Sequence, residues 1–372
     1  MDHDTFCIAP WIYADFEKRD GKRIIRPCCS YGVDGKLPYD VNNLDDWEVS
    51  EKLGEIKTNL LTGVKDSGCA LCWRDEDLKN PSRREKYNDL WGHAPPQENK
   101  LTHFRLRTGN HCNLKCLMCQ PRDSDKIARE YDQMGLEYTL TGREEFDWIG
   151  LAEIKQRIDD IKLLDMLGGE PLLSKPLLEF LRELVDIDRA KDIDLIFDTN
   201  GTVYTPRLAE LLSEFKSVNF KISMEAVGAA NDYIRYPSKF TKVVKNIDLY
   251  KQLPNSHVQF MPTFGILNIF TFPDLLSWAE QRGLPMAMFN YVHTHSYQDP
   301  VVLPMPLKEQ LIEKIEGRTW NYMGPIEAIK SICATPSDPV LFQQFKDYIS
   351  IRDIQRKQNI LESLPYFKPY WN

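Results

Sequence analysis

The chain reads Cys112-Asn113-Leu114-Lys115-Cys116-Leu117-Met118-Cys119 at the point that decides its fold, with three cysteines spaced C-x3-C-x2-C. Thiolates this close in sequence can each bind one corner of a cubane iron–sulfur cluster. A four-iron cluster normally takes four thiolates, and the other side chains of this segment are poor iron ligands. The pattern therefore predicts a [4Fe-4S] cluster with one iron left open, as catalytic metal sites keep a position for a ligand. A zinc site short of one ligand and three buried thiols are the alternatives.

A strand is predicted on each side of this cysteine segment. Residues 102–107 alternate apolar and polar side chains, as a half-buried strand does. Residues 161–167 read as a second strand, which runs into Gly168-Gly169-Glu170-Pro171. A pair of glycines alone usually marks only a turn, so the weight of this motif comes from its place after the cysteines and a strand.

The cysteine spacing and the Gly-Gly-Glu-Pro motif together resemble the radical S-adenosylmethionine (SAM) superfamily. In that family the open iron binds the amino and carboxylate groups of SAM. The resemblance implies that Cys112, Cys116 and Cys119 hold the cluster. It also implies that Gly168 and Gly169 let the backbone approach the methionine ammonium group, and that Glu170 accepts from that group or braces the loop. A one-electron donor such as ferredoxin or flavodoxin is expected to reduce the cluster.

Strands and helices continue to alternate as far as Val292. Strands are expected over 193–198, 218–225, 257–264 and 285–292, and helices over 176–187, 206–215, 239–253 and 273–282. Such alternation predicts an α/β fold with a parallel sheet and helices outside it. The resemblance implies a partial (βα)6 TIM-like barrel over residues 101–299, with its chemistry at the C-terminal ends of the strands.

The resemblance assigns further cofactor contacts to residues at the ends of these strands. Asn200 would contact the SAM ribose, Ser223 the ribose or the methionine, and Met118 would lie near the adenine, where relatives usually carry an aromatic residue. Arg235 would pair with the SAM carboxylate, which suits the two-pronged guanidinium group. An ordinary Asn-Gly turn and a surface arginine are the alternatives for Asn200 and Arg235.

Two carboxylates are candidates for the catalytic acid–base group. Glu225 and Asp198 both fall at predicted strand ends that face the barrel mouth. Either could accept the proton that leaves when the substrate is oxidised. A carboxylate there could equally hold a substrate amine or a ribose.

A second set of cysteines lies before the barrel: Cys7, Cys28, Cys29, Cys69 and Cys72. Residues 1–77 resemble a SPASM or Twitch auxiliary domain, in which four cysteines hold a complete second [4Fe-4S] cluster. The resemblance implies ligation by Cys7, Cys28, Cys69 and Cys72, with Cys29 as the substitute for Cys28. A structural zinc site has the same ligand pattern and stays open as an alternative.

Proline-rich stretches suggest where the domains meet. Residues 78–100, with Asn80-Pro81 and Ala94-Pro95-Pro96, are expected to connect the auxiliary domain to the barrel. Residues 300–372 are expected to form a helical C-terminal extension that closes the barrel or packs on the auxiliary domain. Cys333, the ninth cysteine, is expected to be a buried apolar side chain.

Composition agrees with a cytoplasmic enzyme. At 372 residues, 42% of them hydrophobic, the chain can build a barrel core and a small second domain. Residues 1–5 do not resemble a signal peptide, no apolar run approaches membrane-span length, and cysteines grouped by ligand spacing suggest a reducing compartment. The net charge of −8 argues against an extended nucleic-acid surface.

Three functional hypotheses follow. The favoured one is a radical SAM enzyme that abstracts hydrogen from a peptide side chain or a small polar metabolite, with net oxidation or bond formation assisted by the auxiliary cluster. The second is radical SAM modification of a nucleotide or modified nucleobase, for which basic residues within 79–107 are the only hint. The third is a non-enzymatic, zinc-binding interaction protein.

Overall fold

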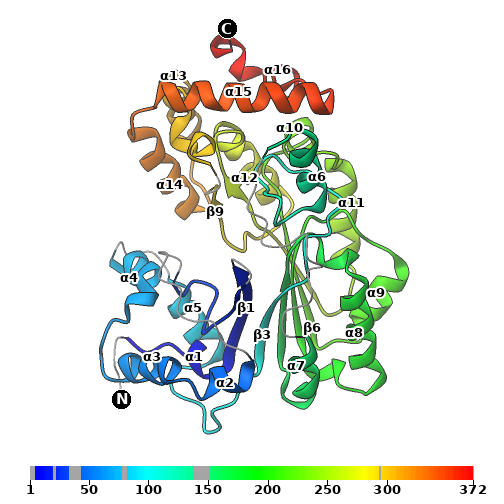
Figure 1. The fold of residues 1–372 in the computed structure, drawn as a ribbon. Coiled ribbons are helices and arrows are strands. Elements are labelled where there is room, and N and C mark those ends of the chain that lie inside the picture. The colour runs from blue at the N-terminus through cyan, green and yellow to red at the C-terminus, as the bar shows by residue number, and fades with distance from the viewer. Residues whose placement is uncertain are drawn as a thin grey trace. The chain divides into compact units, whose positions relative to one another are not determined.

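The computed structural model describes residues 5–19, 22–32, 43–77, 82–136, 151–292 and 295–371 (Figure 1). The fold is α/β with a sheet of mainly parallel strands, as predicted. The chain divides into two compact units. The first unit holds Met1–Asn110, Thr139–Phe197 and Leu211–Val218, and the second holds His111–Tyr138, Asp198–Glu210 and Asn219–Asn372.

The sheet of the first unit has the strand order β2-β1-β3-β4-β5. Its strands are β1 (Tyr13–Arg19), β2 (Lys22–Arg26), β3 (His103–Arg107), β4 (Leu163–Leu167) and β5 (Asp194–Thr199), the last of which ends in the second unit. All neighbouring pairs are parallel except β1 with β2. The predicted strands over 102–107, 161–167 and 193–198 are therefore confirmed.

The N-terminal residues extend this sheet rather than standing apart from it. β1 pairs with β3 through Tyr13 opposite His103 and Asp15 opposite Arg105. The cysteine spacing of residues 1–77 gave no sign of these two strands. The predicted domain boundaries at residues 77 and 100 stay predictions.

The helices of the first unit are α1 (Ala9–Ile12), α2 (Leu44–Glu48), α3 (Glu51–Leu61), α4 (Ala70–Asp77), α5 (Arg83–Trp91), α7 (Leu151–Gln156) and α8 (Lys175–Asp186). α5 lies inside the segment that was expected to be a linker. It begins with a capping box, in which Ser82 Oγ accepts from Glu85 N and the Glu85 carboxylate accepts from Ser82 N. Asn80-Pro81, the turn signal of that prediction, lies outside the described residues.

One face of α5 covers the first strands of the sheet. Tyr87 and Trp91, one helical turn apart, stack with ring centroids 4.4 Å apart. Trp91 also lies 5.8 Å from Tyr13 of β1 and 4.6 Å from His103 of β3, measured between ring centroids. The Trp91 ring covers His103, which is buried.

In the second unit, β6 (Ser217–Ile222, shared with the first unit) lies next to β7 (Ser256–Phe260). The prediction of one strand over 257–264 is wrong, because β7 ends at Phe260 and β8 begins at Thr263. Pro262 lies between them and has no N–H to donate to the ladder. β8 (Thr263–Phe264) instead pairs in parallel with β9 (Asn290–Tyr291). Of the strand expected over 285–292, Met286 also forms an isolated parallel bridge with Phe260 of β7.

The second unit is otherwise helical. Its helices are α6 (Asp125–Gln133), α9 (Pro206–Ser213, shared with the first unit), α10 (Ala229–Ile234), α11 (Phe240–Tyr250), α12 (Phe272–Gln281), α13 (Met305–Ile315), α14 (Met323–Ala334), α15 (Pro339–Arg356) and α16 (Ile360–Ser363). The C-terminal residues are helical, as expected, and Cys333 is buried in α14. That residues 300–372 form a separate extension stays a prediction. Across the described ranges, no helix is both long and apolar enough to cross a membrane.

His103 makes the stability of the first unit depend on pH. Burial, assisted by the Lys162 cation, lowers the pKa of His103 from 6.5 to about 4. The unfolded chain therefore takes up a proton that the folded chain does not, as the pH falls from 7 toward 4. Between pH 7.5 and 5.5 we expect this group to reduce the free energy of unfolding by about 1 kcal/mol.

Urea unfolding of the wild type and of His103→Asn at both pH values tests this expectation. The variant should lose that part of the pH dependence, whereas His257→Asn, at an exposed position, should keep it. Equal pH dependence in all three proteins would contradict the assignment.

Candidate functional site

The three cysteines of the C-x3-C-x2-C loop lie together in the second unit. Cys112 and Cys116 are buried, Cys119 is half-buried, and Leu114 and Met118 pack with them in one apolar cluster. Cys119 N donates to Cys116 O at 3.1 Å, and Leu114 N donates to the sulfur of Cys112 at 3.4 Å. An N–H directed at sulfur favours the thiolate that a metal needs. The donor set and its buried position fit an iron–sulfur cluster.

The backbone of this loop is held by hydrogen bonds from outside it. Lys115 N donates to Tyr236 O at 2.6 Å and Leu117 N donates to Ile234 O at 2.9 Å, both at the end of α10. Cys112 N donates to Asp125 Oδ1 at 3.0 Å, at the start of α6. These hydrogen bonds hold the loop backbone against α6 and the end of α10, and so orient its cysteines.

Asn200 lies directly against the cysteine loop. Its amide donates to Asn113 Oδ1 at 2.8 Å and approaches the sulfur of Cys112 at 3.9 Å. Its carbonyl oxygen accepts from Thr202 N at 2.9 Å and from Thr202 Oγ1 at 2.6 Å. The structure therefore places Asn200 beside the predicted cluster ligands, and its contact with the ribose stays a prediction.

Arg235 and Glu225 form a buried ion pair. The Arg235 Nη1–Glu225 Oε2 distance is 2.9 Å, and both residues are buried. Burial raises the pKa of Glu225, and the Arg235 cation opposes that rise. The sequence analysis predicts separate roles for these residues, Arg235 at the SAM carboxylate and Glu225 at the leaving proton. For Arg235 to bind the SAM carboxylate, or for Glu225 to accept a proton, the ion pair between them must either include the ligand or break.

The other predicted residues of the second unit have protein partners. The Asp198 carboxylate lies 3.6 Å from Lys221 Nζ in a half-buried ion pair. Ser223 is half-buried, and its N–H donates to Thr199 O at 2.8 Å. Met118 packs against the cysteine cluster, which agrees with a position near a bound cofactor.

The Gly-Gly-Glu-Pro motif lies in the first unit, at the end of β4. Gly168 has φ = 136°, and a Cβ there would lie 2.5 Å from Gly109 O, so only glycine fits. Gly169 N donates to the same oxygen at 2.7 Å. Glu170 is buried and accepts from Leu172 N at 3.2 Å. These contacts give the motif a structural role at the end of β3, and its role toward SAM stays a prediction.

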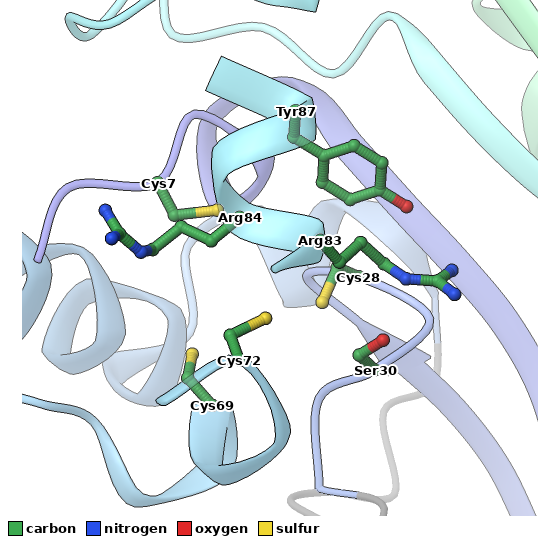
Figure 2. Close-up of a pocket in the computed structure, with 8 residues that line it drawn as sticks. All are labelled: Cys7, Cys28, Ser30, Cys69, Cys72, Arg83, Arg84 and Tyr87. Carbon is green, nitrogen blue, oxygen red and sulfur yellow. The ribbon is translucent and has the colours of Figure 1, made fainter. Parts of the chain in front are cut away.

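Four of the N-terminal cysteines line one small pocket in the first unit (Figure 2). Its lining residues are Cys7, Cys28, Ser30, Cys69, Cys72, Arg83, Arg84 and Tyr87. Burial raises the pKa of Cys7 to about 12 and also raises that of Cys72. Without metal these thiols are protonated near neutral pH, so metal binding there must release protons.

Cys29 is not among the residues that line this pocket. Its sulfur contacts the Arg83 guanidinium and lies 3.4 Å from the Tyr87 hydroxyl. Burial raises the pKa of Cys29, but the Arg83 and Arg105 cations outweigh burial and hold that pKa below its ordinary value. Spacing alone could not separate Cys28 from Cys29, and the structure places Cys28 with the other three cysteines.

This geometry predicts different effects of two neighbouring substitutions. Cys28→Ser should remove metal from the N-terminal site, because it replaces a pocket-lining thiol. Cys29→Ser should keep the metal, because its sulfur faces Arg83 and Tyr87. Metal analysis of the two anaerobically purified variants provides the measurement. Loss of metal from the Cys29 variant alone would reverse the assignment.

Residues 106–279 match the family model of the Radical SAM superfamily. Among curated proteins, the GTP 3',8-cyclase of Alkaliphilus oremlandii is 30% identical over 154 residues, which cover 41% of this chain and 42% of that protein. The GTP 3',8-cyclase of Nautilia profundicola is 27% identical over 198 residues, covering 52% of this chain and 58% of that protein. The chain thus spans less than two thirds of the length of these relatives.

Among solved structures, the chain has weak similarity to anSMEcpe with bound AdoMet and to Streptococcus suis SuiB bound to the precursor peptide SuiA. The first is 17% identical with a TM-score of 0.40, covering 57% of this chain and 58% of that chain. The second is 13% identical with a TM-score of 0.39, covering 78% of this chain and 55% of that chain.

Proposed function

Because residues 106–279 match the family model of the Radical SAM superfamily, we propose that this protein is an enzyme that cleaves SAM reductively at a [4Fe-4S] cluster. Cys112, Cys116 and Cys119 would hold the cluster. The observation that carries this proposal is the buried loop with three thiols and no fourth cysteine of its own. The parallel strands and outer helices are compatible with the partial (βα)6 barrel that the sequence predicts.

The chain's own residues bind and orient SAM in this proposal. The chemistry that the bound cluster supplies is one-electron reduction of SAM, which gives methionine and a 5'-deoxyadenosyl radical, with ferredoxin or flavodoxin as the electron donor. Arg235 is suited to the SAM carboxylate because its guanidinium is buried near the loop that carries Cys116. Glu225, already paired with Arg235, would hold that guanidinium in position while the carboxylate binds.

Each of the three loop cysteines should be essential for SAM cleavage. Cys112→Ala, Cys116→Ala and Cys119→Ala should each abolish the formation of 5'-deoxyadenosine from SAM under dithionite. Cys333→Ala is the matched control, since it also removes a buried thiol, but from α14. Its rate should stay near that of the wild type. A loop variant that cleaves SAM at the wild-type rate would disprove the assignment of that cysteine.

We extend the proposal to a second [4Fe-4S] cluster on Cys7, Cys28, Cys69 and Cys72. Four cysteines around one pocket support it. A structural zinc site on the same four cysteines is the alternative. Iron, sulfide and zinc analysis of the anaerobically purified protein separates the two.

If this second cluster takes an electron from the substrate, its loss should uncouple the reaction. Cys69→Ala combined with Cys72→Ala should still form 5'-deoxyadenosine, because the loop cysteines are intact, but product formation should fall much more. Cys29→Ala is the control, because its sulfur lies outside the pocket. Circular dichroism should first show that the double variant is folded. A folded double variant with full coupling would contradict an electron-accepting role.

Two substrate classes fit this proposal. The first is a peptide side chain or a small polar metabolite that undergoes net oxidation or bond formation. The second is a nucleotide, which the names of the relatives in the preceding comparison favour. Substrate-dependent formation of 5'-deoxyadenosine with GTP, with other nucleotides and with candidate peptides separates the two classes.

A further inference from the structure

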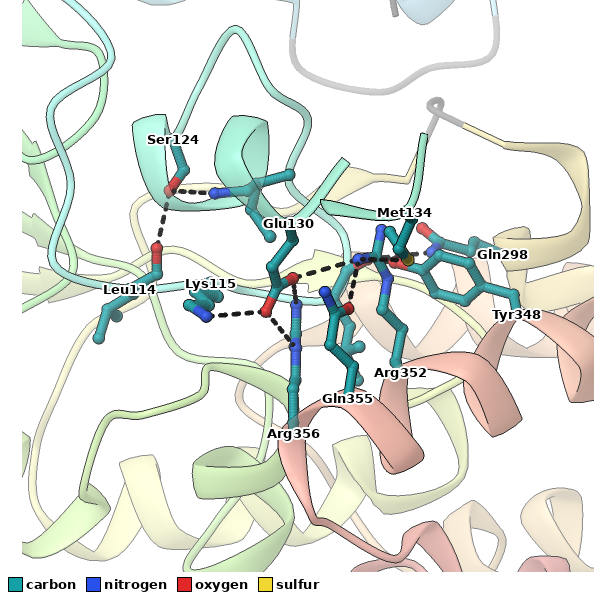
Figure 3. A network of polar contacts seen from close by, with 12 residues as sticks. Leu114, Lys115, Ser124, Glu130, Met134, Gln298, Tyr348, Arg352, Gln355 and Arg356 are labelled. Carbon is teal, nitrogen blue, oxygen red and sulfur yellow. Dashed lines mark hydrogen bonds and ion pairs between the residues drawn. The ribbon is translucent and has the colours of Figure 1, made fainter. Parts of the chain in front are cut away.

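Helix α15 places one row of polar side chains against the second unit's cysteine loop (Figure 3). Tyr348, Arg352 and Arg356 follow one another at four-residue intervals, which puts them on one face of the helix. Each of the three contacts either the loop itself or Glu130, which binds the loop. From the sequence, the C-terminal helices were expected only to close the barrel or to pack on the auxiliary domain.

The first contact fixes a peptide group between two predicted cluster ligands. Tyr348 Oη donates to Leu117 O at 2.8 Å, and Gln298 Nε2 donates to the same oxygen at 3.0 Å. Leu117 lies between Cys116 and Cys119. A carbonyl oxygen has two lone pairs, and both are used here. The orientation of this peptide is therefore set by side chains from outside the loop.

The second contact reaches the loop through a buried carboxylate. Glu130 is 1% exposed and accepts from Arg356 Nη2 at 2.7 Å, from Arg352 Nη1 at 3.1 Å and from Lys115 at 3.0 Å. Lys115 lies in the loop between Cys112 and Cys116. A carboxylate so deeply buried is stable only with such partners. The carboxylate thus links the arginines of α15 to the loop's lysine.

We infer that α15 is a positioning element for the cluster loop, with Tyr348 and Arg356 as positioning residues that set the reduction potential and reactivity of the SAM-binding cluster. This inference rests on the proposed function. Hydrogen bonds and charges around a cluster tune its potential. Tyr348 and Gln298 fix the peptide beside Cys119, and the arginines fix Lys115 beside Cys116.

Tyr348→Phe gives the sharpest test, because it removes one hydroxyl and keeps the ring. We expect full iron content and an unchanged fold. SAM cleavage should nevertheless slow about fivefold, which is the rate change that corresponds to the free energy of one hydrogen bond. The midpoint potential and the electron paramagnetic resonance spectrum of the reduced loop cluster should also shift. Tyr322→Phe is the matched control, since its hydroxyl also donates to a carbonyl, that of Leu284, at 2.6 Å.

Arg356→Gln with Arg356→Lys provides an independent pair. Gln should shift the same spectrum and potential, and Lys should restore them in part, because it keeps the charge beside Glu130. Arg318→Gln, which breaks the Arg318–Glu280 ion pair elsewhere in this unit, should leave both unchanged.

Suppose that the wild type binds the cluster and cleaves SAM. If Tyr348→Phe then has the same rate, potential and spectrum as Tyr322→Phe, the inference is overturned but the proposed function is not. A wild type without cluster or SAM cleavage would overturn the proposed function instead. Amide hydrogen exchange over 112–119 measures loop positioning directly. It should be faster in Tyr348→Phe than in Tyr322→Phe, and equal rates would also overturn the inference.

Discussion

The arrangement of the second unit depends on holding three thiols at fixed positions on a segment that is neither helix nor strand. Such a segment has no ladder of its own, so its buried N–H and C=O groups need partners from elsewhere. Carbonyls at the end of α10 take two of its N–H groups, and the Asp125 carboxylate takes a third. Helices α6, α10 and α15 are therefore tied to the loop by its hydrogen-bonding requirements.

Buried charge in this unit is paired in ways that keep side chains in one geometry. Glu130 has three cationic partners, and Glu225 has Arg235. Removing Arg235 would leave Glu225 as an uncompensated charge in a medium of low dielectric constant, which costs several kcal/mol. Burying these ion pairs costs desolvation energy, but the pairs hold their side chains in a single arrangement. That property suits residues which must orient a cofactor.

Short-range patterns predicted most of what the structure shows. Alternation located β3, β4 and β5, and the cysteine spacing located both thiol clusters. Partners far apart in sequence were missed, because no local pattern carries them: Tyr348 and Leu117 are 231 positions apart. Glu225 and Arg235 were both singled out, yet their pairing depends on how the chain turns through α10. Pro262 was a readable signal for the break between β7 and β8.

The number of thiols at each site, more than the identity of the metal, separates the proposed roles. A cubane on three thiolates has one iron with a free position, whereas a cubane on four thiolates has none. The N-terminal pocket gathers four cysteines, whereas the fifth, Cys29, contacts Arg83 and Tyr87. In the proposed function, a cubane on those four thiols has no open iron, so electron transfer or folding is left as the task of that site. SAM would then bind at the loop, where the chain supplies three thiols.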